Sequence, residues 1–340
     1  MPLPANRPLL LALPLLAFAP SGLAADCNTI ADDQLRLECY DALFGRPLVL
    51  EESPVEAAEA EELVAALESE QESEVKKHLQ REDLLFGHKF AILPHDKTYI
   101  LPYTYMKSPN QRSYRGLALG PDQDEPLDNE EVKFQISLKI PLVEDFLLQD
   151  STLWFGYTQL SLWQMYNTDA SAPFRETNYS PEVAWSIPTG LSVLGADVEL
   201  FNLGFVHQSN GRGEPLSRSW NRIYAEFVLA RNRWAFSLKP WYRIPEDADD
   251  DDNPDIEDYL GYADLKAAYK WNDDWMLSAT FRNNMQSEEN RNSVTLGLSF
   301  PLPGRLNGYL EYVNGYGETL IDYNHRTQRI GIGVILTDWY

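Results

Sequence analysis

Apolar and polar residues alternate in many short stretches after about residue 90, and this period-two pattern restricts the fold more than any other feature. Such alternation is typical of β-strands with one apolar face. Clear examples lie at residues 134–140, 294–300 and 330–336. Their apolar positions are Phe134, Ile136, Leu138 and Ile140, then Val294, Leu296, Leu298 and Phe300, and finally Ile330, Ile332, Val334 and Leu336. We expect this part of the chain to be all-β.

The connections between the expected strands alternate in length. Long polar loops are expected at 107–130, 166–180, 210–218, 245–258, 283–292 and 314–325. Shorter turns are expected at 141–151, 188–196, 231–233, 271–274 and 301–307. Six loops and five turns separate twelve strands, and long loops at one end are the pattern of outer-membrane barrels. The sequence therefore predicts a transmembrane antiparallel β-barrel of about twelve strands over residues 85–340.

Composition agrees with this prediction and excludes several other classes. A net charge of −24 disfavours nucleic-acid binding, which needs a basic surface. Aromatic residues make up 12% of the 340 residues, too many for a disordered chain. No apolar run reaches the ~18 residues of a membrane-spanning helix. The alternative fold is a soluble β-sandwich or lipocalin-like barrel, which usually needs only about 100–200 residues.

Both ends of the chain carry expected targeting signals. Residues 1–25 have one charge, Arg7, followed by an apolar core at 9–19 and small residues at the end, which predicts a secretory signal peptide. We expect cleavage near Ala24 or Ala25. The chain ends in Trp339-Tyr340 after an alternating strand, which resembles the signal read by the barrel assembly machinery.

Residues 26–84 form an expected extension with two distinct parts. Cys27 and Cys39 are the only cysteines, and in an oxidising compartment a local disulfide is the simplest interpretation, with two free thiols as the alternative. Residues 51–74 contain ten Glu and no Lys or Arg. A run of this kind is usually a solvated helix or tether, and binding of a periplasmic partner is the alternative function.

Three polar residues fall on the apolar face of one expected hairpin. His207 and Ser209 share the parity of Phe205, and Asn221 shares the parity of Ile223. In a membrane barrel that face meets lipid, where polar side chains are costly unless they bond one another. A hairpin centred on residue 214 places 207 opposite 221, with Cβ atoms about 4.5–5.5 Å apart. A hydroxyl, an imidazole and an amide can then act as nucleophile, base and orienting group. The alternative is that these are polar residues at the level of the lipid headgroups.

Several longer motifs resemble the outer membrane phospholipase A family. The matching runs are 207–212, 217–222, 157–159, 173–179, 251–255, 315–318 and 322–324. The resemblance covers about residues 85–340, and it implies a twelve-stranded barrel in the cell outer membrane. It also implies a calcium-dependent hydrolase that cleaves acyl esters of phospholipids and lysophospholipids (A1/A2 type) near the outer leaflet.

The resemblance also implies a role for individual residues. Ser209 would be the nucleophile, His207 the base and Asn221 the third member, with the backbone N–H of Gly211 in the oxyanion hole. The calcium ligands would be the Arg212 carbonyl and Ser217 of one subunit and Ser171 of its partner. Asp252 matches a carboxylate linked to a second calcium position, and Gln159 a polar residue at the homodimer interface.

Two other functional classes remain open at this point. A porin or passive channel would direct its polar side chains into the lumen, in contrast to the parity of the three hairpin residues. An adhesin or structural anchor would use the Glu-rich region, and its binding would be lost on deletion of residues 26–84.

Overall fold

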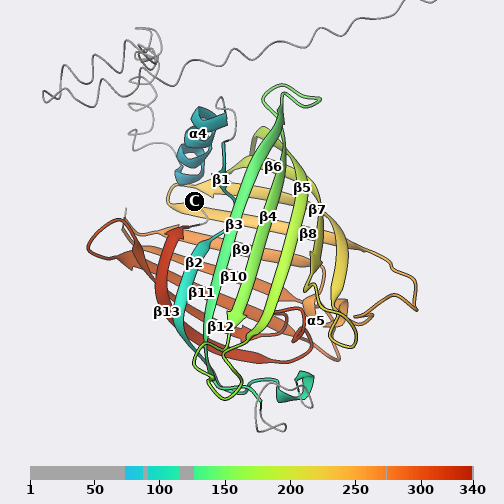
Figure 1. Ribbon diagram of the computed structural model, residues 1–340. Coiled ribbons are helices and arrows are strands. Elements are labelled where there is room, and N and C mark those ends of the chain that lie inside the picture. The colour runs from blue at the N-terminus through green and yellow to red at the C-terminus, as the bar shows by residue number, and fades with distance from the viewer. Residues whose placement is uncertain (1–72, 87–90, 115–125, 273, 339–340) are drawn as a thin grey trace, which may run out of the picture. The chain divides into compact units, whose positions relative to one another are not determined.

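The computed structural model describes residues 73–86, 91–114, 126–272 and 274–338. Strands β2 to β13 pair in antiparallel fashion with their sequence neighbours, and β13 pairs with β2, so the sheet closes into a barrel of twelve strands (Figure 1). The predicted fold class and strand number are therefore confirmed. The expected signal peptide at 1–25, the cysteines Cys27 and Cys39, and the Glu-rich run up to residue 72 lie outside the described residues.

The barrel strands are β2 (Thr98–Met106), β3 (Glu130–Glu144), β4 (Thr152–Trp163), β5 (Phe174–Val193), β6 (Ala196–Ser209), β7 (Ser219–Arg231), β8 (Trp234–Ile244), β9 (Ala263–Lys270), β10 (Met276–Asn283), β11 (Asn292–Pro301), β12 (Asn307–Gly315) and β13 (Thr327–Thr337). A short strand, β1 (Leu93–Pro94), adds to β3 at Lys139 and Leu138. The helical elements are α4 (Glu74–Phe86), the 3-10 turn η1 (Gln111–Ser113) and α5 (Glu257–Leu260). No helix in the described ranges is long and apolar enough to cross a membrane.

Apolar side chains point outward from the barrel and polar ones inward. Ile136, Leu296, Ile330, Ile332 and Leu336 of the predicted stripes are all exposed on the outer wall. Lipid is the solvent that matches such a wall, because only alternate residues of a barrel strand meet it.

Buried ion pairs fill the interior toward the loop end. The Arg175 guanidinium contacts Glu131 at 2.9 Å and Asp322 at 2.5 Å. Arg329 reaches Glu131 at 2.6 Å and Glu318 at 2.9 Å. Buried charges are tolerated when each is paired in this way. A polar network thus occupies the interior of the barrel toward the loop end.

Strand β5 is longer than the sequence predicted. The loop expected at 166–180 ends at Pro173, and the turn expected at 188–196 is only Leu194 and Gly195. Arg175, Glu176 and Asn178 fall within the expected loop, with barrel packing or a lumen position as the alternative for Arg175 and Glu176; all three are buried and face the lumen. Their polarity therefore reflects the interior of the barrel and not a solvent-exposed loop.

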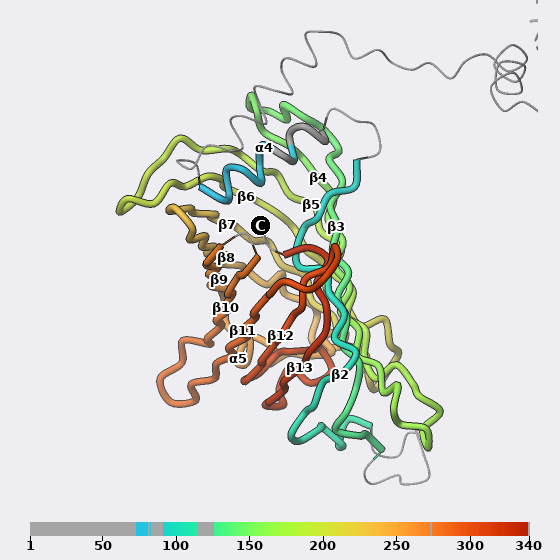
Figure 2. The backbone as a smooth tube through the Cα atoms, turned by 90° about the vertical axis from the view of Figure 1, so that its left-hand side faces the viewer, coloured from blue at the N-terminus to red at the C-terminus, as the bar shows by residue number. Residues whose placement is uncertain are grey.

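Helix α4 lies inside the turn end of the barrel (Figures 1 and 2). Val75 packs against the inward-facing Val228, Ala230 and Ala235. Glu82 accepts a hydrogen bond of 2.8 Å from Lys139 of β3. Apolar packing and this ion pair hold the helix within the barrel.

Candidate active site

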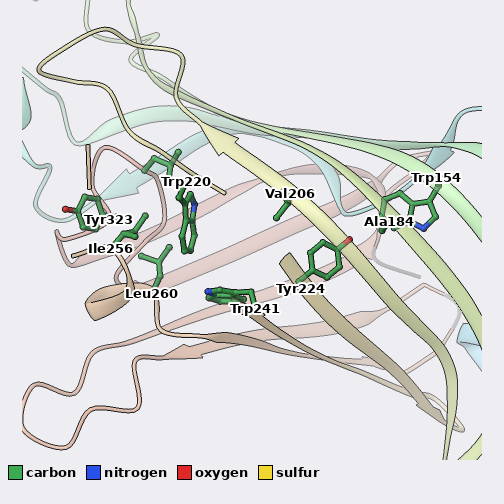
Figure 3. Packing of buried hydrophobic residues seen from close by; sticks show 10 residues of the cluster. Trp154, Ala184, Val206, Trp220, Tyr224, Trp241, Ile256, Leu260 and Tyr323 are labelled. Carbon is green, nitrogen blue, oxygen red and sulfur yellow. The ribbon is translucent and has the colours of Figure 1, made fainter. Parts of the chain in front are cut away.

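The hairpin β6–β7 carries the three predicted polar residues on its outer face. His207 pairs with Asn221 and Ser209 with Ser219, which confirms the register predicted from a hairpin centred on residue 214. Phe205 and Ile223, on the same face, are 43% and 47% exposed. The intervening side chains, such as Val206, Trp220 and Tyr224, point into the barrel and pack in its core (Figure 3).

The imidazole and the amide are in direct contact. His207 Nδ1 lies 2.9 Å from Asn221 Oδ1, and Asn221 Nδ2 donates to Glu246 Oε1 at 3.0 Å. Ser209 lies on the same face as His207, two residues along β6, but within the described residues its hydroxyl makes no hydrogen bond to the ring. Catalytic hydrogen bonds are often long in the absence of substrate, so this geometry is compatible with a nucleophile and base.

The loop that follows Ser209 is held by one buried amide. Asn210 is 4% exposed, and its Nδ2 donates to the Leu216 carbonyl at 2.8 Å. Its Oδ1 accepts from the backbone N–H of Arg218 at 3.0 Å and of Arg212 at 3.3 Å. No role of Asn210 was predicted from the sequence. The available signal was an Asn-Gly pair inside a hairpin loop, where a short amide side chain often bonds to nearby backbone.

Gly211 has a left-handed backbone conformation that favours glycine. Its φ is +63°, and a Cβ at this position would lie 3.1 Å from the ring of Tyr179. Within the described residues its N–H donates no hydrogen bond, so this group is free to bind an anion beside Ser209.

The expected calcium ligands lie in loops at the end of the barrel that also carries the hairpin tip. The loops after β4, β6 and β8 hold Ser171, Ser217 and Asp252 respectively, and antiparallel alternation places these loops together. The Ser217 hydroxyl donates to the Asp252 carboxylate, so the structure brings these two together. It does not bring Ser171 into that contact.

Charge at this loop cluster suits a hard cation. The hydrogen bond with Asp252 raises the pKa of Glu214, and the hydrogen bond from Ser217 lowers the pKa of Asp252. Carboxylate, hydroxyl and carbonyl oxygens are the donors that Ca²⁺ prefers, so the residues fit this ion.

The Arg212 side chain connects the hairpin loop to strand β5 through a hydrogen bond and an ion pair. Its Nη2 donates to the Arg175 carbonyl at 2.5 Å, and its Nε lies 3.2 Å from the buried Glu176 carboxylate. This side chain therefore fixes the path of the loop, while its own carbonyl oxygen remains the expected calcium ligand. The described residues contain no cluster of three or more His, Cys, Asp and Glu that could hold a metal alone.

Gln159 stands on the same outer wall as the hairpin residues. It pairs with Tyr179 of β5, which in turn pairs with Ser209 of β6. Two strand spacings of about 4.8 Å therefore separate Gln159 from Ser209. Gln159 accepts a hydrogen bond from Tyr157 at 2.9 Å and donates one to Ser161 at 3.1 Å, which forms a polar ladder on a wall that otherwise meets lipid.

The fold is a membrane β-barrel that carries a hydroxyl, an imidazole and an amide on its lipid-facing wall. The family model for phospholipase A1 matches residues 75–336. A phospholipase A1 of Klebsiella pneumoniae is 38% identical over 251 residues, which are 74% of this chain and 84% of the relative. The chain belongs to the phospholipase A1 family and is an outer-membrane β-barrel phospholipase.

Solved structures agree with this assignment. Outer membrane phospholipase A from Escherichia coli superposes with a TM-score of 0.69 at 37% identity, covering 75% of this chain and 96% of that one. The outer membrane phospholipase dimer of Salmonella typhi with bound calcium gives a TM-score of 0.69 at 36% identity, covering 76% of this chain and 97% of that one.

Proposed function

We propose that this protein is a calcium-dependent phospholipase in which Ser209, His207 and Asn221 hydrolyse acyl esters at the lipid-facing wall of the barrel. The observation that carries the proposal is the contact of His207 with Asn221 on the outer face, beside Ser209. Phospholipids and lysophospholipids are the proposed substrates, because the motifs resemble outer membrane phospholipase A and the matching relatives are named phospholipase A1.

In the proposed reaction the Ser209 hydroxyl attacks the ester carbonyl carbon. His207 Nε2 takes the hydroxyl proton and passes it to the leaving alcohol, so an acyl-serine and a lysolipid form. A water molecule then attacks the acyl-serine and His207 takes its proton. As the bond between the acyl group and the Ser209 oxygen breaks, His207 returns that proton to the oxygen, so that fatty acid and free Ser209 result. The Gly211 N–H donates to the carbonyl oxygen while that oxygen is negatively charged.

Calcium is the proposed cofactor. The Arg212 carbonyl and the Ser217 hydroxyl would hold it in one subunit, with Ser171 contributed by the partner, and Asp252 would serve a second position. Bound there, the ion supplies positive charge near the oxyanion. The support comes from the oxygen-rich loop cluster and from the calcium in the Salmonella typhi relative.

A homodimer is the proposed active form. The polar ladder around Gln159 is costly in lipid unless a second copy covers it, and it lies on the same wall as Ser209. The relative from Salmonella typhi is a dimer. Export by residues 1–25, assembly by the barrel assembly machinery and the Cys27–Cys39 disulfide stay predictions.

The function can be tested with refolded protein in detergent micelles that contain calcium and phospholipid. Ser209→Ala should lose hydrolysis by more than a thousandfold, since the nucleophile is gone. Ser219→Ala removes the hydroxyl of the cross-strand partner and should keep full activity. A fluorophosphonate should label Ser209 in a calcium-dependent manner. A Ser209→Ala protein with unchanged calcium-dependent activity would overturn the proposal.

A further inference from the structure

Glu246 contacts Asn221, one of the three proposed catalytic residues, from outside the hairpin that carries them. It follows the end of β8, where Ile244 pairs with Asn221. Its Oε1 accepts a hydrogen bond of 3.0 Å from Asn221 Nδ2. The carboxylate therefore lies one side chain beyond Asn221, on the side opposite His207.

The chemistry of these groups fixes the direction of the whole chain of hydrogen bonds. An ionised carboxylate only accepts, so the amide nitrogen of Asn221 must face Glu246. The amide oxygen must then face His207, and because a carbonyl oxygen also only accepts, the proton must sit on Nδ1. The lone pair is left on Nε2, the nitrogen that can take a proton from a serine.

We propose that Glu246 is a positioning residue for catalysis, which acts through Asn221 to fix the tautomer and orientation of His207. Asparagine alone can form the same bond with either end of its amide, so it does not by itself select a tautomer. The carboxylate removes that ambiguity. It also supplies the negative charge that favours the imidazolium and that Asn221 lacks.

This inference rests on the proposed function, so the experiment first establishes Ser209-dependent hydrolysis in the otherwise unchanged full chain. Glu246→Gln is then compared with Asp249→Asn, which removes one negative charge from an exposed position in the same loop. Glu246→Gln should lower kcat about ten- to hundredfold with KM unchanged, because a neutral amide that can present either end to Asn221 replaces a charged group that only accepts. Asp249→Asn should leave both constants unchanged.

A rescue experiment separates positioning from a general structural role. Asn221→Asp sets a second carboxylate against Glu246, and like charges in contact should lower kcat strongly. In the double variant N221D/E246Q the glutamine amide donates to the new carboxylate. Its kcat should exceed that of Asn221→Asp by at least about tenfold, whereas independent structural damage would multiply the two losses.

Each outcome has one meaning. Hydrolysis that does not depend on Ser209 overturns the proposed function itself. If Ser209 is required but Glu246→Gln behaves like Asp249→Asn, the positioning role is wrong. It is equally wrong if the double variant is no more active than Asn221→Asp.

Discussion

Single residues set the geometry of this site through backbone and amide contacts that no sequence period encodes. The pairing of His207 with Asn221 was predictable, because parity and the centre of a hairpin follow from the alternation itself. The roles of Asn210 and Glu246 were not. Their hydrogen bonds depend on how the loops at 210–218 and 245–258 fold back, and loop paths follow no repeating pattern.

The proposed role of the Gly211 backbone N–H in the oxyanion hole leads to a prediction that compares Gly211 with the nearby Gly213. Gly211→Ala should lower kcat about tenfold, because a Cβ at a φ of +63° costs about 1–2 kcal/mol and would push the loop away from Tyr179. Gly213→Ala is the matched control, since a Cβ there meets nothing within 4 Å. Steady-state kinetics with calcium compares the two, and equal activity would argue against a role for the Gly211 backbone.

The buried amide of Asn210 makes a second prediction at this scale. Asn210→Ala leaves the Leu216 carbonyl and the Arg218 N–H without their partner. The ordered conformation of the loop should be destabilised by about 1–3 kcal/mol, and activity should fall with it. Hydrogen exchange of the backbone amides at 211–218 should accelerate by about ten- to hundredfold. Unchanged exchange rates would show that the loop is held by other contacts.

Among the elements, the positions of most strands were predictable from the sequence. The ends of strand β5 were the least predictable of the strand boundaries. A run of polar residues predicts a loop if solvent is the only polar environment that the chain can meet. The lumen of a barrel is a second polar environment, so polar residues can also belong to a strand. Arg175, Glu176 and Asn178 are buried there with ion pairs and hydrogen bonds as partners. Knowledge that the sheet closes is needed before these residues can be assigned to a strand, and closure is a long-range property.

Helix α4 gives a pH prediction at the element scale. Burial raises the pKa of Glu82, but Lys139 and His78 lower it by more, so the net pKa lies below the ordinary value. A lowered pKa stabilises the docked helix above the ordinary glutamate pKa, and this stabilisation is lost as the pH falls through the lower value. Hydrogen exchange over residues 74–86 should therefore accelerate on acidification below about pH 4.

Glu82→Gln is the control for this prediction. It removes the titrating group, so the helix should exchange faster than wild type at neutral pH. Its exchange should change little more on acidification, once the intrinsic pH dependence of amide exchange is subtracted. A wild-type helix that is equally protected at both pH values would contradict the role of the Glu82–Lys139 pair.

On the scale of the whole molecule, closure of the sheet decides which wall meets lipid and which chemistry each wall can carry. The interior holds buried ion pairs, and the outer wall holds mostly apolar side chains; the polar exceptions at the site are the hairpin residues and the ladder around Gln159. Pairing through Tyr179 places both exceptions in one row across β4, β5 and β6. A second barrel that covers the ladder would thus also cover the site.

Because the Gln159 ladder and the site lie in one row, we predict that a substitution that weakens dimerisation also lowers activity. Gln159→Leu should weaken dimerisation in calcium-containing micelles about five- to thirtyfold. This corresponds to about 1–2 kcal/mol, the free energy of one polar hydrogen bond between membrane-embedded segments. Activity should fall at low protein concentration and recover at high concentration, because the catalytic residues are intact. Asn314→Leu removes a polar side chain from β12, four strands from β4, and should leave both properties unchanged. Sedimentation equilibrium and hydrolysis measured over the same concentration range test this link, and a Gln159→Leu protein that is monomeric yet fully active would show that one barrel suffices.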